Sequence, residues 1–273
     1  MIGTTMTVGS LTIPRVGVGT WPLDDEAARR QVGLALGLGY RAVDTAVNYD
    51  NETGVGAGIR DSGIPRDEVA LTTKLDGRHP GVEADRGIDE SLARLGTDHV
   101  DLLLIHWPLP ARDHYLPSWR AFIDIRRDGR AREIGVSNFR PAHLERVIAE
   151  TGVVPVLNQI ELNPYVRRRD HVAFHREAGI VTAAWSPLGA GNGLLEEEVV
   201  VRIARRLGRS PAQVVLRWHL EQGHLVTPKA TTPARLAENL AVFDFALTAD
   251  DHAAIDTLDR GDGAGVDSDV FGH

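Results

Sequence analysis

The sequence predicts an α/β protein folded as a (β/α)8 barrel, the TIM-barrel architecture, and three observations lead there. Short β-branched and apolar runs alternate with amphipathic stretches from residue 15 to residue 245. Eight such units follow one another, which is the number that a closed barrel of this kind requires. The apolar runs are nearly continuous, as in VDLLLI at 100–105, which is typical of parallel strands buried on both faces. An open doubly wound sheet is the alternative, and the pattern favours the barrel.

Composition and start and stop signals locate each strand and helix. The strands are predicted at 15–21, 41–46, 69–75, 100–107, 132–138, 155–162, 180–188 and 224–230. The helices between and after them are predicted at 24–38, 51–62, 82–95, 117–128, 141–150, 168–178, 210–222 and 232–242. Glycines that end helices in a left-handed conformation stand at 39, 63, 96, 152 and 179. Ser210 before Pro211, with Gln213, predicts a capped helix start.

Three further elements complete the predicted barrel. TMTV and LTIP, joined by Gly9 and Ser10, predict a hairpin before the first strand, which we expect to close the barrel floor. Extra helices are predicted late in the chain, near 195–207 and from 248 onward. No linker or repeat divides the sequence, so we expect residues 1–273 to form a single domain.

Composition narrows the compartment and the partners. The chain has no cysteine, which excludes disulfides and thiolate chemistry and favours a reducing compartment. The first residues carry no signal-peptide pattern, and no apolar run has the ~18 residues of a membrane span. The net charge is -8, without a basic face. We therefore expect a cytoplasmic protein that binds neither membranes nor nucleic acids.

Polar residues close nearly every predicted strand. They are Asp44 with Tyr49 just beyond it, Lys74, His106, Ser137 with Asn138, Gln159 and Lys229. Because the C-terminal ends of barrel strands meet at one face, we expect these side chains to converge at one mouth. Each one taken alone has an ordinary structural explanation, such as a cap or a surface lysine. The combination predicts a site.

The residue types at this mouth suit proton transfer to an oxygen atom. A lysine beside a tyrosine favours the phenolate, so Lys74 is expected to lower the pKa of Tyr49 toward neutral. A buried ammonium needs a counter-charge, and Asp44 ends a neighbouring strand. His106 is expected to orient a carbonyl oxygen and to stabilise its developing charge. With cysteine absent, the hydride that completes a reduction has to come from a cofactor.

Several motifs resemble those of the aldo-keto reductases over essentially the whole chain. They are GYRAVDTAVNYDNETGVG (39–56), TTKL (72–75), HWP (106–108), GVSNF (135–139), NQIELNP (158–164) and PKATTPARLAEN (228–239). The end of the chain, with VFDF and then GDG, is similar to bacterial reductases of the 2,5-diketo-D-gluconate reductase type.

This resemblance implies a monomeric, NADPH-dependent reductase of aldehydes or ketones. It implies Tyr49 as the acid, Lys74 and Asp44 as its tuning pair and His106 as the residue that orients the substrate. Cofactor contacts are implied for Ser137, Asn138 and Gln159 (carboxamide), Trp185 (nicotinamide stacking), Ser186 and Leu188 (pyrophosphate), Lys229 and Arg235 (2′-phosphate), and Glu238 and Asn239 (adenine). Trp21 and Trp107, with Tyr49 and His106, are expected to line the substrate site, together with the tail at 262–273.

The sequence departs from the family pattern at three places. Ala230 stands where serine is common, which removes a hydroxyl from the predicted phosphate site unless Thr231 or Thr232 replaces it. The segment 74–81 is short and lacks an aromatic residue that the family often has. Asp50 follows Tyr49 where glycine is usual, and its effect depends on whether it faces the mouth.

Two rival functions and three weaker signals remain. The rivals are an NADPH-binding sensor module without turnover, and a metal-dependent hydrolase with Asp44 and His106 as ligands.

The glycines at 54, 56 and 58 do not fit a dinucleotide-binding fingerprint, so we expect close helix packing there. His171 and His175 lack a third ligand at a plausible spacing, and no metal site is predicted. The three arginines at 167–169 predict a solvated helix start.

Overall fold

The computed structural model describes residues 2–76, 79 and 81–272, and its centre is one parallel sheet. The strands follow chain order: β3 (Val18–Gly19), β4 (Ala42–Asp44), β5 (Ala70–Leu75), β6 (Val100–Ile105), β7 (Ala131–Ser137), β8 (Leu157–Glu161), β9 (Val181–Trp185) and β10 (Leu225–Val226). The amide of Gly17 donates to the carbonyl of Val226 at 2.9 Å, and the amide of Val226 donates to the carbonyl of Arg15 at 3.0 Å. These bonds join the last strand to the chain just before the first, so the sheet closes and the barrel prediction is confirmed.

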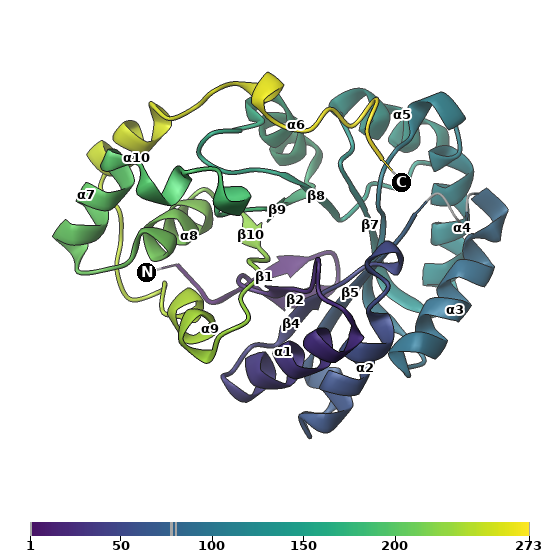
Figure 1. Ribbon diagram of the computed structural model, residues 1–273. Helices are drawn as coiled ribbons and strands as arrows, with labels where there is room; N and C mark the ends of the chain where they lie inside the picture. Colours follow the sequence, from purple (N-terminus) through teal and green to yellow (C-terminus); the bar gives the residue numbers. More distant parts are fainter. Residues whose placement is uncertain (1, 77–78, 80, 273) are drawn as a thin grey trace.

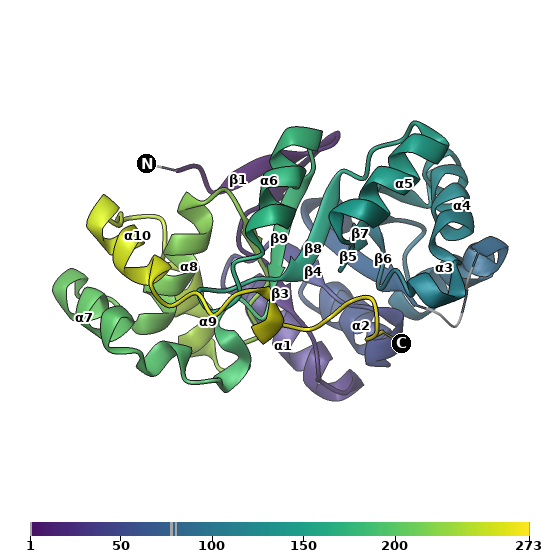
Figure 2. The ribbon, with the colours of Figure 1, turned by 90° about the horizontal axis from the view of Figure 1, so that it is seen from above.

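Helices surround the strands, as Figures 1 and 2 show from two directions. They are α1 (Asp25–Gly37), α2 (Glu52–Asp61), α3 (Ala84–Leu95), α4 (Tyr115–Arg127), α5 (Pro141–Thr151), α6 (Arg169–Ala178), α7 (Glu198–Leu207), α8 (Pro211–Glu221), α9 (Pro233–Leu240) and α10 (Ala249–Asp256). Each helix lies in a predicted range or within a few residues of it, and α7 and α10 are the extra helices. The cap predicted at Ser210 is present, with its hydroxyl accepting from the Gln213 amide.

The N-terminal hairpin closes the floor of the barrel. Strand β1 (Thr5–Val8) pairs antiparallel with β2 (Leu11–Pro14), and Gly9 turns between them at φ 59°. The buried side chains of Val8 and Ile13 pack in one cluster with residues from inside the barrel, among them Leu102 and Leu157. This prediction is also confirmed.

The glycines of α2 allow close helix packing. A Cβ added to Gly54 would lie 2.0 Å from the carbonyl oxygen of Asp25 in α1. A Cβ added to Gly56 would lie 2.0 Å from the carbonyl oxygen of Leu95 in α3. No side chain fits in these gaps, so the packing explanation of the glycine pattern is the correct one.

The prediction of a solvated arginine run at 167–169 is confirmed for Arg169, which is exposed, and is wrong for Arg167 and Arg168. Arg168 is 8% exposed and donates to the Val266 carbonyl at 2.6 Å. Arg167 forms an ion pair with Asp256 and lies over the Trp218 ring at 4.9 Å. The two arginines just before α6 thus contact α8 and the tail, and long arginine stems cover such apolar surfaces well. The sequence pattern contains no sign of this contact.

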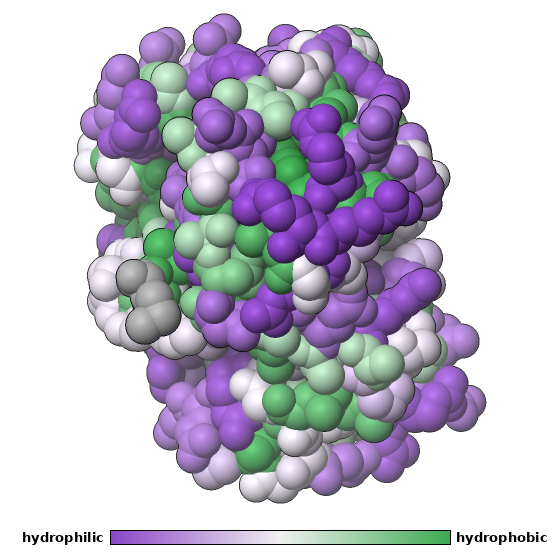
Figure 3. Space-filling model, turned by 90° about the vertical axis from the view of Figure 1, so that its left-hand side faces the viewer, coloured by the Kyte–Doolittle hydropathy of each residue, from purple (hydrophilic) through white to green (hydrophobic). Residues whose placement is uncertain are grey.

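The outer surface is mainly polar on the side shown in Figure 3, where hydrophilic residues are spread over the face and hydrophobic residues occupy smaller areas between them. Among the described residues, no helix combines the length and the apolar character that crossing a membrane takes.

Candidate active site

The site is built around a buried ion pair between neighbouring strands. Lys74 in β5 is 0% exposed, and its Nζ lies 2.7 Å from Oδ2 of Asp44, which ends β4. The ammonium also donates to the Thr45 carbonyl at 2.8 Å. The second carboxylate oxygen of Asp44 accepts from Nε2 of Gln159 at 2.9 Å. Both charges are therefore satisfied within the barrel, as burial requires.

Tyr49 and His106 lie beside this pair at the mouth. A short 3-10 turn over Val47–Tyr49 follows β4 and brings the Tyr49 hydroxyl to 3.3 Å from the Lys74 ammonium. The ring of His106, directly after β6, stands edge-on to the Tyr49 ring at 5.6 Å between centroids. The four residues predicted from the strand ends thus come together. A carbonyl oxygen placed between Tyr49 and His106 can reach both side chains.

The electrostatics correct one expectation. Burial raises the pKa of Tyr49, and it outweighs the opposite effect of Lys74. The phenol therefore holds its proton more tightly than free tyrosine, whereas the sequence predicted a pKa moved toward neutral. For Lys74, burial alone would lower the pKa, but Asp44 and Tyr49 together raise it. The site at neutral pH has a charged ammonium next to a protonated phenol.

A layer of amide and hydroxyl groups lies next to these residues. Asn138 stands at φ 65°, and its Nδ2 donates to the His106 carbonyl and to the Ser137 hydroxyl, each at 3.0 Å. The indole nitrogen of Trp185 donates to Oδ1 of Asn138 at 2.8 Å. The Ser137 hydroxyl donates to the Gln159 carbonyl at 2.8 Å. These bonds fix the orientations of the Trp185 ring and of the amide groups.

A cavity of about 560 Å³ opens over this layer. Its lining includes most of the predicted site residues: Trp21, Asp44, Tyr49, His106, Trp107, Asn138, Gln159, Trp185, Ser186, Leu188 and Lys229. Lys74 lies beneath its floor. Ser137, Arg235, Glu238 and Asn239 do not line it. Residues that the sequence did not single out also line it: Gly19, Thr20, Pro22, Asn48, Pro187, Ala190, Thr227 and Pro228. Thr20 directly follows β3, so its position at a strand end was a signal from which it could have been predicted.

One end of the cavity leads toward α9, where the cations lie. Lys229 and Arg235 are both exposed, and Arg235 sits in the first turn of α9. The hydroxyl of Thr232 accepts from the Arg235 amide at 3.4 Å as the cap of this helix. Ala230 is buried, and its carbonyl accepts from Gln31 at 2.7 Å. Thr231 and Thr232 are both exposed, and the Thr232 hydroxyl caps the helix.

The other end is closed by aromatic side chains and by the tail. Trp107 packs against Phe271 with ring centroids 5.1 Å apart, and Val266 also lines the cavity. The tail is held in place by Arg168, by ion pairs from Arg140, and by the Val266 amide, which donates to Glu161 at 2.6 Å. The expectation that the tail forms a wall is met for these residues.

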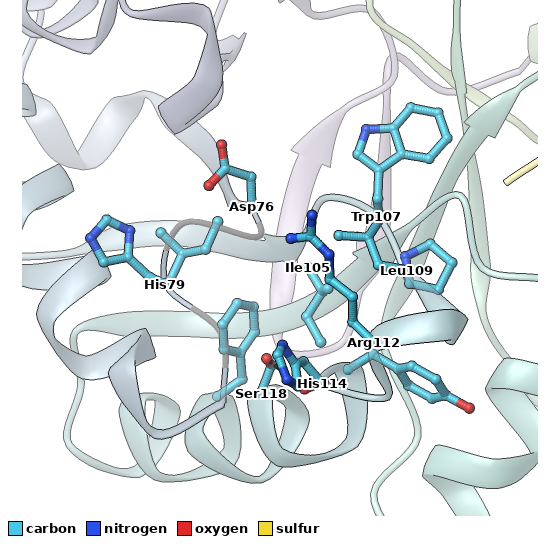
Figure 4. A pocket seen from close by; sticks show the side chains of 12 residues that line it. Asp76, His79, Ile105, Trp107, Leu109, Arg112, His114 and Ser118 are labelled. Carbon is cyan, nitrogen blue, oxygen red and sulfur yellow. Dashed lines mark hydrogen bonds between the residues drawn. The ribbon is translucent and has the colours of Figure 1, made fainter. Parts of the chain in front are cut away.

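A second, much smaller cavity lies on the other side of Trp107. Figure 4 shows Asp76 and His79 on one side of it and Arg112, His114 and Ser118 on the other. Its volume is about 20 Å³, which is room for one water-sized molecule. It is therefore too small for a substrate. Residues 77, 78 and 80 lie outside the described residues, so the expectation about the short 74–81 segment falls partly outside them as well.

Asp50, the third departure from the family pattern, lies outside the cavity lining. It has a left-handed backbone with φ 53°, a conformation that glycine adopts freely and that aspartate tolerates. Its side chain is exposed and is not part of the cavity lining. Asp50 therefore does not form part of the cavity wall.

Comparison with known proteins agrees with this geometry. The profile of the aldo/keto reductase family matches residues 6–260. Methylglyoxal reductase DkgA of Salmonella typhimurium is 43% identical over 264 residues, which cover 95% of this chain and 94% of that protein. A crystal structure of an aldo/keto reductase from Brucella melitensis matches with a TM-score of 0.91 and 48% identity, over 95% of this chain and 100% of that one. A mutant of Gox0644 in complex with NADPH matches with a TM-score of 0.94 and 44% identity, over 99% of both chains.

Proposed function

The chain belongs to the aldo/keto reductase family, and from this premise we propose that it reduces aldehydes or ketones to alcohols with NADPH as the hydride donor. The observation that carries the proposal is the contact of Tyr49 with the buried Lys74–Asp44 pair at the floor of a large cavity. NADPH is named in the complex of Gox0644, and methylglyoxal is the substrate named for DkgA. The first supports NADPH as the cofactor here, and the second supports a small carbonyl compound as the substrate.

The residues that line the cavity carry chemical groups that suit NADPH. The fixed indole of Trp185 offers an aromatic face to a planar ring, and Asn138 and Gln159 offer amide groups to a carboxamide. At the far end Lys229 and Arg235 supply the cations that a 2′-phosphate requires. We therefore assign these residues to NADPH, together with Ser186 and Leu188 of the lining. Ser137, Glu238 and Asn239 are assigned to it on the family resemblance. When bound, the cofactor supplies a hydride to the carbonyl carbon.

The chain's own residues supply the proton and hold the substrate. Because burial raises its pKa, Tyr49 keeps its proton until a carbonyl oxygen gains negative charge. The Lys74 ammonium at 3.3 Å then stabilises the phenolate that proton transfer leaves behind. Asp44 keeps the ammonium in place, and His106 orients the carbonyl oxygen opposite Tyr49. Trp21 and Trp107 provide apolar walls for the rest of the substrate.

The same geometry makes a metal-dependent hydrolase a poor alternative. Both oxygens of Asp44 already accept hydrogen bonds, from Lys74 and from Gln159. Over the described part of the chain, no group of three or more histidine, cysteine or acidic side chains is arranged to hold a metal. A single domain over 1–273, a monomeric state and the cytoplasm remain predictions.

The test is oxidation of NADPH and of NADH, followed with methylglyoxal, glyceraldehyde and a diketo-sugar acid. Tyr49→Phe removes the donated proton and little volume, so turnover is expected to fall by about 100-fold or more, with NADPH binding retained. Tyr165→Phe is the matched control, since the Tyr165 hydroxyl bonds Glu197 and does not face the cavity. Tight NADPH binding without turnover of any carbonyl would support the sensor module instead.

A further inference from the structure

The loop after β9 has an unusual backbone. Ser186 and Ala190 stand at φ 49° and 50°, in a left-handed region that side chains other than glycine rarely adopt. Gly189, Gly191 and Gly193 also have positive φ. Glycine adopts this conformation freely, whereas Ser186 and Ala190 keep it only where the surroundings hold them in place.

Residues of this loop form part of the cavity wall. Ser186, Pro187, Leu188 and Ala190 all line it. Leu188, at φ −99° and ψ 13°, is followed by Gly189 at φ 75°. A right-handed residue followed by a left-handed one turns successive amides to the same side, which is an arrangement that binds anions. The amide of Gly189 already bonds the Ser186 carbonyl, so the amides of Leu188 and Ala190 are the ones that a group such as the pyrophosphate of a dinucleotide would meet.

A buried histidine from α8 holds this loop from behind. His219 is 0% exposed, and its Nε2 lies 3.1 Å from the Pro187 carbonyl oxygen. Helix α8 contributes no residue to the cavity lining, so the bond links the loop to an element outside the site. Within the loop itself, the amide of Gly189 bonds the Ser186 carbonyl at 3.0 Å.

The hydrogen-bond partners fix the tautomer of His219. A carbonyl oxygen only accepts, so Nε2 carries the hydrogen and Nδ1 accepts. Nδ1 of His224, itself 5% exposed, lies 3.4 Å from Nδ1 of His219 and is placed to donate to it. Burial lowers the pKa of His219 to about 3, so the ring stays neutral at physiological pH. The ring of Trp218 packs edge-on at 4.7 Å and restrains its rotation.

We propose that His219 is a positioning residue for the cofactor pyrophosphate: by donating to the Pro187 carbonyl it holds the 186–190 loop in its anion-binding conformation. The inference rests on the proposed function, because it assigns a role toward the same cofactor. The pyrophosphate is present in both NADPH and NADH. We therefore expect a loss of affinity that does not distinguish between them.

The variants separate the donor from the bulk of the side chain. His219→Leu removes the hydrogen bond and keeps an apolar side chain of moderate size. His219→Gln places an amide donor at nearly the same reach as Nε2, whereas His219→Asn carries a donor that is too short to reach Pro187. The Gln and Asn pair keeps the proposal testable if His219→Leu does not fold. His175→Leu is the matched control, since His175 is also 0% exposed and bonds only Asn158 and Thr182 among the described residues.

The readout is the dissociation constant of NADPH, of NADH and of adenosine 2′-phosphate, measured by protein fluorescence with urea unfolding alongside. We expect His219→Leu and His219→Asn to weaken NADPH and NADH by the same factor, about tenfold, which is what loss of one hydrogen bond gives. Adenosine 2′-phosphate lacks the pyrophosphate, so its affinity is expected not to change. His219→Gln is expected to stay within about threefold of the parent, and His175→Leu to bind NADPH normally.

Three results overturn the proposal. One is that adenosine 2′-phosphate loses as much affinity as NADPH, and another is that His175→Leu weakens NADPH equally. Unchanged NADPH affinity in both His219→Leu and His219→Asn is the third, and it leaves the reductase function standing. A parent protein that binds neither dinucleotide overturns both proposals before any variant is made.

Discussion

Removal of the Lys74 ammonium is expected to destabilise the folded protein and to slow turnover. Lys74→Met leaves the Asp44 carboxylate, 6% exposed, without the cation that lies 2.7 Å away. Breaking a buried ion pair by removing one partner costs about 3–5 kcal/mol, which is a large part of the 5–15 kcal/mol that a typical domain has. The same change removes the group that stabilises the Tyr49 phenolate, so turnover is expected to fall as well.

A double-mutant cycle with Asp44→Asn tests the electrostatic explanation. If the cost comes from an uncompensated buried charge, the double variant Asp44→Asn, Lys74→Met is more stable than Lys74→Met alone. We expect a coupling free energy of about 2 kcal/mol or more, measured by urea unfolding followed by circular dichroism at pH 7. Costs that simply add would refute the reasoning, because lost packing alone would then explain the effect.

Arg235→Ala is expected to weaken the binding of NADPH about tenfold or more and to leave the binding of NADH nearly unchanged, because a hydrogen bond to a charged phosphate is worth ~1.5–3 kcal/mol. Equal losses of affinity for the two cofactors in binding titrations would contradict the assignment of Arg235 to the 2′-phosphate. Burial lowers the pKa of His175 to about 3, so between pH 6.5 and pH 3 the unfolded state binds a proton that the folded state does not. The free energy of unfolding therefore decreases as the pH is lowered, by about 1.4 kcal/mol per pH unit. Urea midpoints between pH 6.5 and 5 are therefore expected to fall less steeply in His175→Leu, and an unchanged slope would refute this. Gly56→Ala is expected to lower the free energy of unfolding by about 1–3 kcal/mol, since its Cβ would lie 2.0 Å from the Leu95 carbonyl oxygen. The control Gly37→Ala, with no atom within 4 Å of its Cβ, is expected to be neutral or stabilising, and equal effects in a urea series would argue against the packing explanation.

The sequence alone determined the units of the barrel and the residues at its mouth. Period, glycine stops and capping residues are local signals, so strands such as Val100–Ile105 and helices such as α8 could be located without any tertiary contact. The convergence of Asp44, Lys74 and His106 also followed, because parallel strands of a barrel end at one face. The common position of the strand ends was therefore enough to place these residues in one site.

How strongly these groups influence one another depends on the three-dimensional fold. The direction of the Tyr49 pKa shift depends on burial, which outweighs Lys74, and no spacing in the sequence measures burial. The packing of Arg167 on Trp218 and the bond from His219 to the Pro187 carbonyl, 32 residues apart, join segments whose local patterns are unrelated. Closure of the barrel likewise depends on backbone bonds between Gly17 and Val226. Contacts of this kind form where the fold brings distant segments together, and local sequence patterns do not encode their distances.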